Sequence, residues 1–260
     1  MLNNKSKKEK HVVILIATLS LVVLVGILFL EAIPQDAHYH NFADTREILN
    51  VSNFWNVVSN IPYFMVGIYA LYKILVLKSL KILDEIHLAY VLFFMGVTLV
   101  AFGSGYYHLD PNNETLLWDR LPMTIAFMAL FSFVVSEFLS IKLGKLLLFP
   151  LLLVGLLSVL YWFFSELQGS GDLRAYILVQ FLPMLIMPLM FLFFKASFSL
   201  VKGYWYLLLC YLLAKVFEHF DAEIYEILGF ISGHSLKHVV SALGVYILVY
   251  IFEKRYRHEA

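Results

Sequence analysis

Two histidines four residues apart, His234 and His238, occur in the sequence Gly-His-Ser-Leu-Lys-His at the start of the last apolar segment. On a helix, such positions lie on one face, one turn from each other. Two imidazoles in this arrangement can hold one metal ion, as they do in known zinc motifs. A metal site needs at least one more ligand, which must come from elsewhere in the chain.

A second segment offers a histidine, a hydroxyl and a carboxylate. These are His108, Ser104 four residues before it, and Asp119 eleven residues after it. Three histidines leave one position on a tetrahedral zinc ion open, which is the pattern of a catalytic site. A zinc ion lowers the pKa of its water to about 7, so hydroxide becomes available at neutral pH.

Ser104 and Asp119 each have a structural and a catalytic interpretation. Ser104 is either a small residue at a contact between helices or a donor to a developing oxyanion. Asp119 is either the N-cap of the helix that follows or a base that orients or deprotonates the water. The sequence alone leaves both pairs of alternatives open.

Other histidines compete for the metal. His219 is a rival third ligand, although Lys215 and Glu218 beside it favour a buried ion-pair network within one helix. His38 and His40 lie in a polar loop, where we expect them to be solvated. Without a third ligand, the final histidine pair would only bond headgroups or loop carbonyls at a helix end.

The composition predicts an integral membrane protein. Of the 260 residues, 61% are hydrophobic and 15% are charged, and the mean hydropathy is +0.80. A soluble domain carries about 25% charged residues. The net charge of zero gives no electrostatic support for a nucleic-acid partner, and the single cysteine, Cys210, excludes an internal disulfide framework.

Eight stretches are long enough to cross a bilayer, which takes about 20 mostly apolar residues. They are 12–31, 55–77, 86–107, 120–141, 145–165, 174–195, 203–219 and 234–252. The first follows a group of lysines, as in a signal peptide, but it is too long and is followed by a poor cleavage site, so we expect an uncleaved anchor. The predicted fold class is an all-α polytopic membrane protein, with a seven-transmembrane helical core plus one extra N-terminal transmembrane helix.

The distribution of basic residues predicts the orientation. With the N-terminus inside and eight spans, most Lys and Arg residues fall on inside segments. Both termini are then cytoplasmic, in a basic N-terminus with its anchor helix (1–40), a seven-helix core (41–252) and a short tail (253–260). His108, Asp119 and the final histidine pair all fall near the outer face. The short loops and the absence of retention signals favour the cell membrane.

Taken together, these residues resemble the alkaline ceramidases. Ser104, His108, Asp119 and a His234–His238 pair in the last span follow one another in that family's order. The sequence Phe-Trp-Asn-Val-Val-Ser-Asn at 54–60 is similar to the opening of its first core helix. The resemblance extends over the predicted core. The family belongs to a superfamily of seven-helix membrane hydrolases that includes the adiponectin and progestin receptors.

The resemblance implies a role for each of the five residues. His108, His234 and His238 would bind Zn²⁺, Asp119 would hold the zinc water, and Ser104 would assist at the oxyanion. The implied reaction is hydrolysis of a ceramide-like lipid amide to a fatty acid and a long-chain base. The implied partners are the membrane lipid substrate and the bilayer, with no obligate protein partner evident.

The family also implies a calcium site. It uses an acidic loop just before the first core helix, where Asp44, Glu47 and Asn53 are the candidate Ca²⁺ ligands in this chain. This loop lacks the family's run of adjacent carboxylates and its tryptophan.

Two other classes of membrane protein compete with a hydrolase. One is a heptahelical receptor-like protein with a structural zinc, which the short inside segments disfavour because they offer little surface to a partner. The other is a transporter with a metal or proton relay. Transporters often show repeated halves and broken helices, and neither is clear in this sequence.

Overall fold

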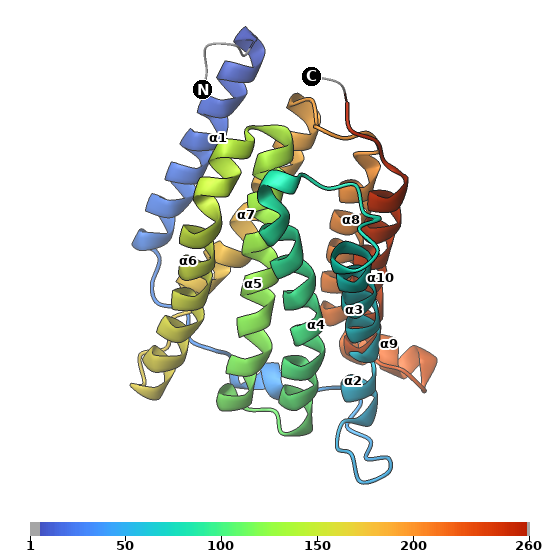
Figure 1. The fold of residues 1–260 in the computed structure, drawn as a ribbon. Helices are drawn as coiled ribbons and strands as arrows, with labels where there is room; N and C mark the ends of the chain where they lie inside the picture. The colour runs from blue at the N-terminus through green and yellow to red at the C-terminus, as the bar shows by residue number, and fades with distance from the viewer. Residues whose placement is uncertain (1–5, 259–260) are drawn as a thin grey trace.

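The computed structural model describes residues 6–258 as a bundle of helices, joined by turns and two isolated bridges (Figure 1). The α-helices are α1 (Lys7–Gly26), α2 (Phe54–Val58), α3 (Ile61–Leu75), α4 (His87–Leu109), α5 (Asn113–Phe138), α6 (Ile141–Leu167), α7 (Arg174–Phe193), α8 (Lys202–His219), α9 (Asp221–Leu228) and α10 (Gly233–Lys254). The predicted all-α fold class is confirmed.

Among the described residues, seven helical segments are long and apolar enough to cross a membrane. They are Lys7–Phe29, Phe54–Leu75, Asp84–Leu109, Asn113–Phe138, Ile141–Leu167, Arg174–Phe193 and Gly233–Lys254. The remaining predicted span is α8, which is 18 residues long and packs against α10. It is less apolar because Lys202, Lys215 and Glu218 lie on it.

The bundle has two distinct ends (Figure 1). The start of α1 and the end of α10 lie together at one end, which we name the terminal end. The other end holds α2, α9 and the turn between α4 and α5, and we name it the histidine end. Helix α1 lies on the periphery, where it contacts α7. Its side chains at Ile14, Leu21 and Leu24 are exposed and can face lipid, as expected for an anchor helix.

Helix α5 begins earlier than the sequence predicted, at Asn113 and not near residue 120. The Asn112 side chain caps it by accepting hydrogen bonds from the backbone of Glu114 and Thr115. Asp119 therefore lies inside the helix, beyond its first turn. The interpretation of Asp119 as an N-cap is wrong, because Asn112 supplies the cap.

A segment that we name the strap, residues 30–53, connects α1 to α2 and crosses the histidine end of the bundle (Figure 1). Its first part is held by the end of α6 and by the connection between α6 and α7. The Leu173 backbone N–H donates to the carbonyl of Ile33 at 2.8 Å, and the Gln35 backbone N–H donates to Glu166 at 2.6 Å. The first part of the strap is thus fixed to the core.

Two Asp-x-Arg pairs fasten the ends of the strap. Arg174 pairs with Asp172 at 2.8 Å and donates to the carbonyl of Leu30. Arg46 pairs with Asp44 at 2.6 Å and also reaches the loop between α9 and α10. The carboxylates are 4% and 1% exposed, so each arginine neutralises an acid that water hardly reaches.

At the terminal end, a buried ion pair ties α5 to the segment after α10. Arg255 donates to both carboxylate oxygens of Glu137, at 2.8 and 3.0 Å. The hydroxyls of Tyr90 and Tyr204 donate to the same carboxylate. All hydrogen-bonding oxygens of Glu137 are thereby satisfied, which a buried charge requires.

Candidate active site

The three candidate zinc ligands lie together at the histidine end of the bundle. His108 comes from the end of α4, and His234 and His238 come from the first turns of α10. One ring nitrogen from each lies within 4.8 Å of the others, and the side chains are buried. The Nε2 atoms of His108 and His234 are 3.3 Å apart. The structure therefore brings together the two segments that the sequence singled out.

The separation of the Nε2 atoms of His108 and His234 fits a zinc ion. Zinc holds imidazole nitrogens at about 2.05 Å in a tetrahedron, which separates two of its ligand atoms by about 3.3 Å. The Nδ1 atom of His108 is buried and has no hydrogen-bond partner within residues 6–258. Three imidazoles so close together could not all be charged, so they suit a cation as their common partner.

A serine orients one of the three rings. The Oγ of Ser59 lies 2.8 Å from Nδ1 of His238, which leaves Nε2 of that ring for a metal. Contacts of this kind fix the tautomer and direction of a ligating histidine. Ser59 lies between α2 and α3, and it was not singled out from the sequence.

The strap closes the site from one side. The ring of Phe42 packs edge-on against the rings of His108 and His234, with centroids 4.7 and 4.5 Å away. Phe42 is 8% exposed. This apolar contact keeps water away from two of the imidazoles.

Ser104 and Asp119 meet where α4 and α5 approach each other closely. A Cβ atom on Gly103 would lie 2.1 Å from the carbonyl oxygen of Trp118, so a larger residue would push the helices apart. The side chains of Ser104 and Asp119 interact there, and both line a cavity that also reaches His238. Ser104 lies one turn from His108 on the same helix face.

That cavity has a volume of about 460 Å³ and differs in character along its length. Its polar end contains Ser104, Asp119, Arg120 and His238, and residues of the strap also line it. Its other end is lined by apolar side chains, among them Phe93, Val97, Leu130, Met184 and Val245. An apolar pocket with a few polar groups at one end is suited to an amphipathic ligand.

The depth of the cavity matches a lipid chain. Ser104 and Phe93 line it at positions eleven residues apart on α4, which at a rise of 1.5 Å per residue is about 16 Å. One leaflet of a bilayer contributes about 15 Å of hydrocarbon. Helices α7 and α8 face each other across the cavity, and Phe181 of α7 lines it while 43% exposed.

Three charged residues of α8 and α10 form a network at the polar end. Glu218 accepts from Lys215 at 2.7 Å and from Lys237 at 2.6 Å. The predicted pair of Lys215 and Glu218 is confirmed, whereas Lys237 was not expected to join it. His219 is not part of the three-histidine group, so the structure does not support it as a ligand.

The expectation that His40 is solvated is wrong. Its ring nitrogens lie 2.9 Å from the hydroxyl of Tyr107 and 3.1 Å from Oδ1 of Asn113. Burial lowers the pKa of His40, although the bond to Asn113 opposes that shift. His40 thus joins the strap to α4 and α5.

The three candidate calcium ligands have different surroundings and contacts. Both carboxylate oxygens of Asp44 accept from Arg46, at 2.8 and 2.6 Å. Glu47 is exposed, and the Asn53 side chain donates to the carbonyl of His108 at 2.8 Å. Within residues 6–258, the group of His, Cys, Asp or Glu side chains that is placed to hold a metal consists of His108, His234 and His238. Calcium binding stays a prediction that these observations do not test.

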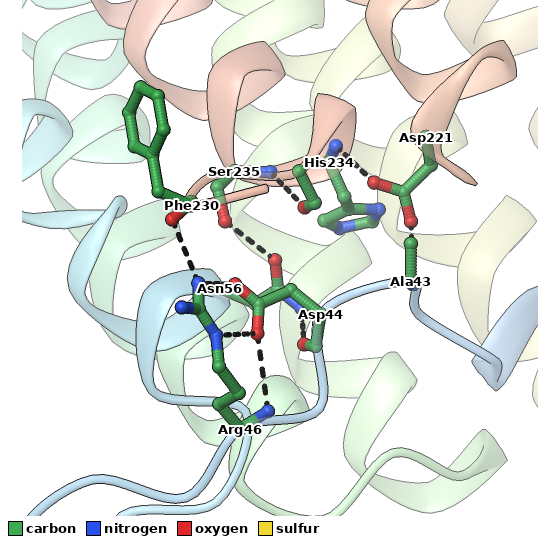
Figure 2. A network of polar contacts seen from close by, with 9 residues as sticks. Ala43, Asp44, Arg46, Asn56, Asp221, Phe230, His234 and Ser235 are labelled. Carbon is green, nitrogen blue, oxygen red and sulfur yellow. Dashed lines mark hydrogen bonds and ion pairs between the residues drawn. The ribbon is translucent and has the colours of Figure 1, made fainter. Parts of the chain in front are cut away.

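Figure 2 shows how the strap is joined to the helix that carries the histidine pair. The backbone carbonyl of Asp44 accepts from the Asn56 side chain at 3.1 Å. Asn56 in turn accepts from the hydroxyl of Ser235 at 2.8 Å. Ser235 lies between the two histidines in sequence, so this chain of bonds leads from the strap to the site.

A second route passes through Asp221, at the start of α9 (Figure 2). One oxygen of its carboxylate accepts from the backbone N–H of His234 at 2.6 Å, and the other accepts from the backbone N–H of Ala43 at 2.9 Å. The position of His234 is therefore fixed against the strap as well as within its own helix.

The fold and the site together define a polytopic membrane protein with a buried three-histidine centre beside a cavity of lipid dimensions. The family model described as Ceramidase matches residues 40–259, so the chain belongs to the ceramidase family. This confirms the resemblance seen in the sequence. Comparison with individually curated proteins found no match. Family membership supports a membrane enzyme that hydrolyses ceramide, and hence an amide-bond hydrolase with a lipid substrate.

Proposed function

We propose that this protein is a zinc-dependent intramembrane amidohydrolase that cleaves ceramide-like lipids to a fatty acid and a long-chain base. The observation that carries the proposal is the group of three buried histidines, with nitrogens within 4.8 Å of one another, at the polar end of an apolar cavity. Membership of the ceramidase family supports the same conclusion.

His108, His234 and His238 would hold the zinc ion, with Ser59 and Asp221 fixing two of them in place. A zinc ion bound there would lower the pKa of a water molecule and polarise a carbonyl group. The imidazoles are buried, and the neutral form of an imidazole is the one that binds a metal ion.

Asp119 would transfer the protons, and Ser104 would stabilise the negative charge that develops on the amide oxygen. Asp119 accepts a proton from the attacking water and returns it to the nitrogen of the leaving amine. Ser104 donates a hydrogen bond to the amide oxygen as negative charge develops on it. A carbon–oxygen bond forms and the carbon–nitrogen bond breaks, which gives the fatty acid and the free base.

The substrate would reach the site from within the bilayer. The strap covers the histidine end, whereas α7 and α8 face each other across the cavity. We propose that the lipid passes between α7 and α8, with its acyl chain in the apolar end and its amide near His238. We also propose that both termini are cytoplasmic, which places the site near the outer face of the cell membrane.

Zinc content and lipid hydrolysis, measured on the same purified samples, test this proposal. Wild type should contain about one zinc per chain and hydrolyse ceramide, and His238→Ala should lose both. Asp119→Asn should keep the metal but lose about 10²- to 10⁴-fold in turnover. Full activity in Asp119→Asn would refute the mechanism. Zinc without hydrolysis of any lipid amide would instead favour a receptor-like protein with a structural zinc.

A further inference from the structure

Arg120 is a buried cation at the polar end of the cavity that the proposed mechanism does not use. It follows Asp119 in α5 and is 5% exposed. Its Nη2 donates to the side-chain oxygen of Gln35 in the strap at 2.6 Å. Its Nη1 is buried and has no hydrogen-bond partner within residues 6–258. An unsatisfied donor on a buried charged group is costly, so a partner for it is expected.

Arg120 differs in this respect from the two other cations of the cavity. Lys215 and Lys237 both pair with Glu218. No carboxylate forms an ion pair with Arg120 in the part of the chain that the structure describes. Unlike these two lysines, Arg120 therefore lines the cavity without a direct counter-ion.

Aromatic rings hold the Arg120 guanidinium in place. Its central carbon lies 4.0 Å from the ring centroid of Trp162, 4.7 Å from that of Tyr176 and 5.8 Å from that of Tyr39. Cation–π contacts compensate part of the cost of burying the charge. They also fix its position, which is the condition for recognising a ligand with little loss of entropy.

The direction of the Arg120 side chain separates it from the reacting groups. Consecutive residues of a helix point about 100° apart. Asp119 accordingly faces Ser104 on α4, whereas Arg120 faces α6, α7 and the strap. With an acyl chain in the apolar end and the amide near His238, the amine part of a substrate would extend toward the strap.

We propose that Arg120 binds an anionic group on the amine part of the substrate, so that the preferred substrates are N-acyl lipids with an acidic headgroup. Carboxylate, phosphate and sulfonate share the required chemistry, because each offers oxygens to a guanidinium. This inference rests on the proposed function for the orientation of the lipid. It makes Arg120 a residue that determines specificity.

Two pairs of lipids with one acyl chain test the inference. The first is N-dodecanoyl ceramide and its 1-phosphate, and the second is N-dodecanoyl ethanolamine and N-dodecanoyl glycine. Wild type should show kcat/KM about 10- to 100-fold higher for the acidic member of each pair, as expected for hydrogen bonds to a charged group. In Arg120→Gln this ratio should fall to near one, mainly through KM, and Arg120→Lys should restore part of it. Equal ratios in wild type and Arg120→Gln would overturn the proposal.

Equilibrium binding separates a failure of this inference from a failure of the proposed function. Asp119→Asn should bind the acidic lipid of each pair about tenfold more tightly than the neutral one, and the added change Arg120→Gln should remove the difference. If wild type with bound zinc hydrolyses none of the lipids while this difference is present, the hydrolase proposal fails and the anion site stands. If dodecanoate or vesicles of phosphatidylglycerol compete as well as the acidic lipids, the anion is a product or the bilayer, and the specificity role is refuted.

Discussion

Replacement of Arg46 by glutamine should weaken zinc binding although Arg46 lies outside the metal site. Arg46 neutralises the buried carboxylate of Asp44 and donates to the carbonyl of Phe230, just before α10. Asp44 in turn accepts from Asn56, which is bonded to Ser235 between the two histidines. Without Arg46, the carboxylate would remain buried and unpaired, and the strap would have to move to hydrate it.

The size of the effect follows from the exposure of the pair. Removing one partner of a fully buried ion pair costs about 3–5 kcal/mol. Asp44 is 1% exposed but Arg46 is 39% exposed, so solvent screens part of the interaction and the loss of stability should be smaller than for a fully buried pair. Disturbing a group that orients a metal ligand typically lowers metal affinity about 10- to 100-fold, and we expect the lower end for Arg46→Gln.

Arg174→Gln is the matched control, because it breaks the other Asp-x-Arg pair of the strap. Arg174 is 24% exposed and also holds a strap carbonyl, so the loss of thermal stability should be similar. Zinc affinity, measured by competition with a chromogenic chelator, should fall in Arg46→Gln and stay near the wild-type value in Arg174→Gln. The double variant Asp44→Asn with Arg46→Gln should recover part of the lost stability, since no unpaired charge remains. Equal loss of zinc affinity in both single variants would refute the proposed coupling.

Three further predictions concern other parts of the molecule. Val245→Trp should fill the apolar end of the cavity and shift the preferred acyl chain toward shorter lengths, measured across a series of N-acyl lipids. Glu137→Gln should leave Arg255 buried beside a neutral partner and cost about 3–5 kcal/mol, seen as a lower unfolding temperature; an unchanged temperature would contradict this account. Hydrogen bonds from Arg174 lower the pKa of Asp172 to about 2, so this pair should stabilise the fold above about pH 4 and cease to do so as the pH falls toward 2. In an acid titration of unfolding, Arg174→Gln should lack that component.

The polar residues of the site could be found from the sequence because ionisable groups are expensive in apolar segments. His108 and the pair in α10 stood out for this reason, and the helical period correctly placed the pair on one face. The sequence left Asp119 open as an N-cap because the predicted span begins near residue 120. The Asn112 cap overrode that expectation.

The contacts that depend on packing between helices could not be found in this way. Nothing in the sequence near Ser59 indicates that it orients His238, because the two are 179 residues apart. The same holds for Glu137 and Arg255, which are joined only when α5 and the end of α10 meet. The surroundings of Arg120 could not be predicted either, since its aromatic neighbours come from three separate elements.

The strap determines from which phase, membrane or water, the substrate would reach the site. Because it closes the histidine end while the cavity is lined by α7 and α8, the protein would sample the lipids of its own leaflet and not molecules dissolved in water. The reaction rate should then follow the mole fraction of substrate within the membrane or micelle. Adding inert detergent at constant bulk substrate would slow the reaction, and two membranes with equal total substrate but different areas would be processed at different rates.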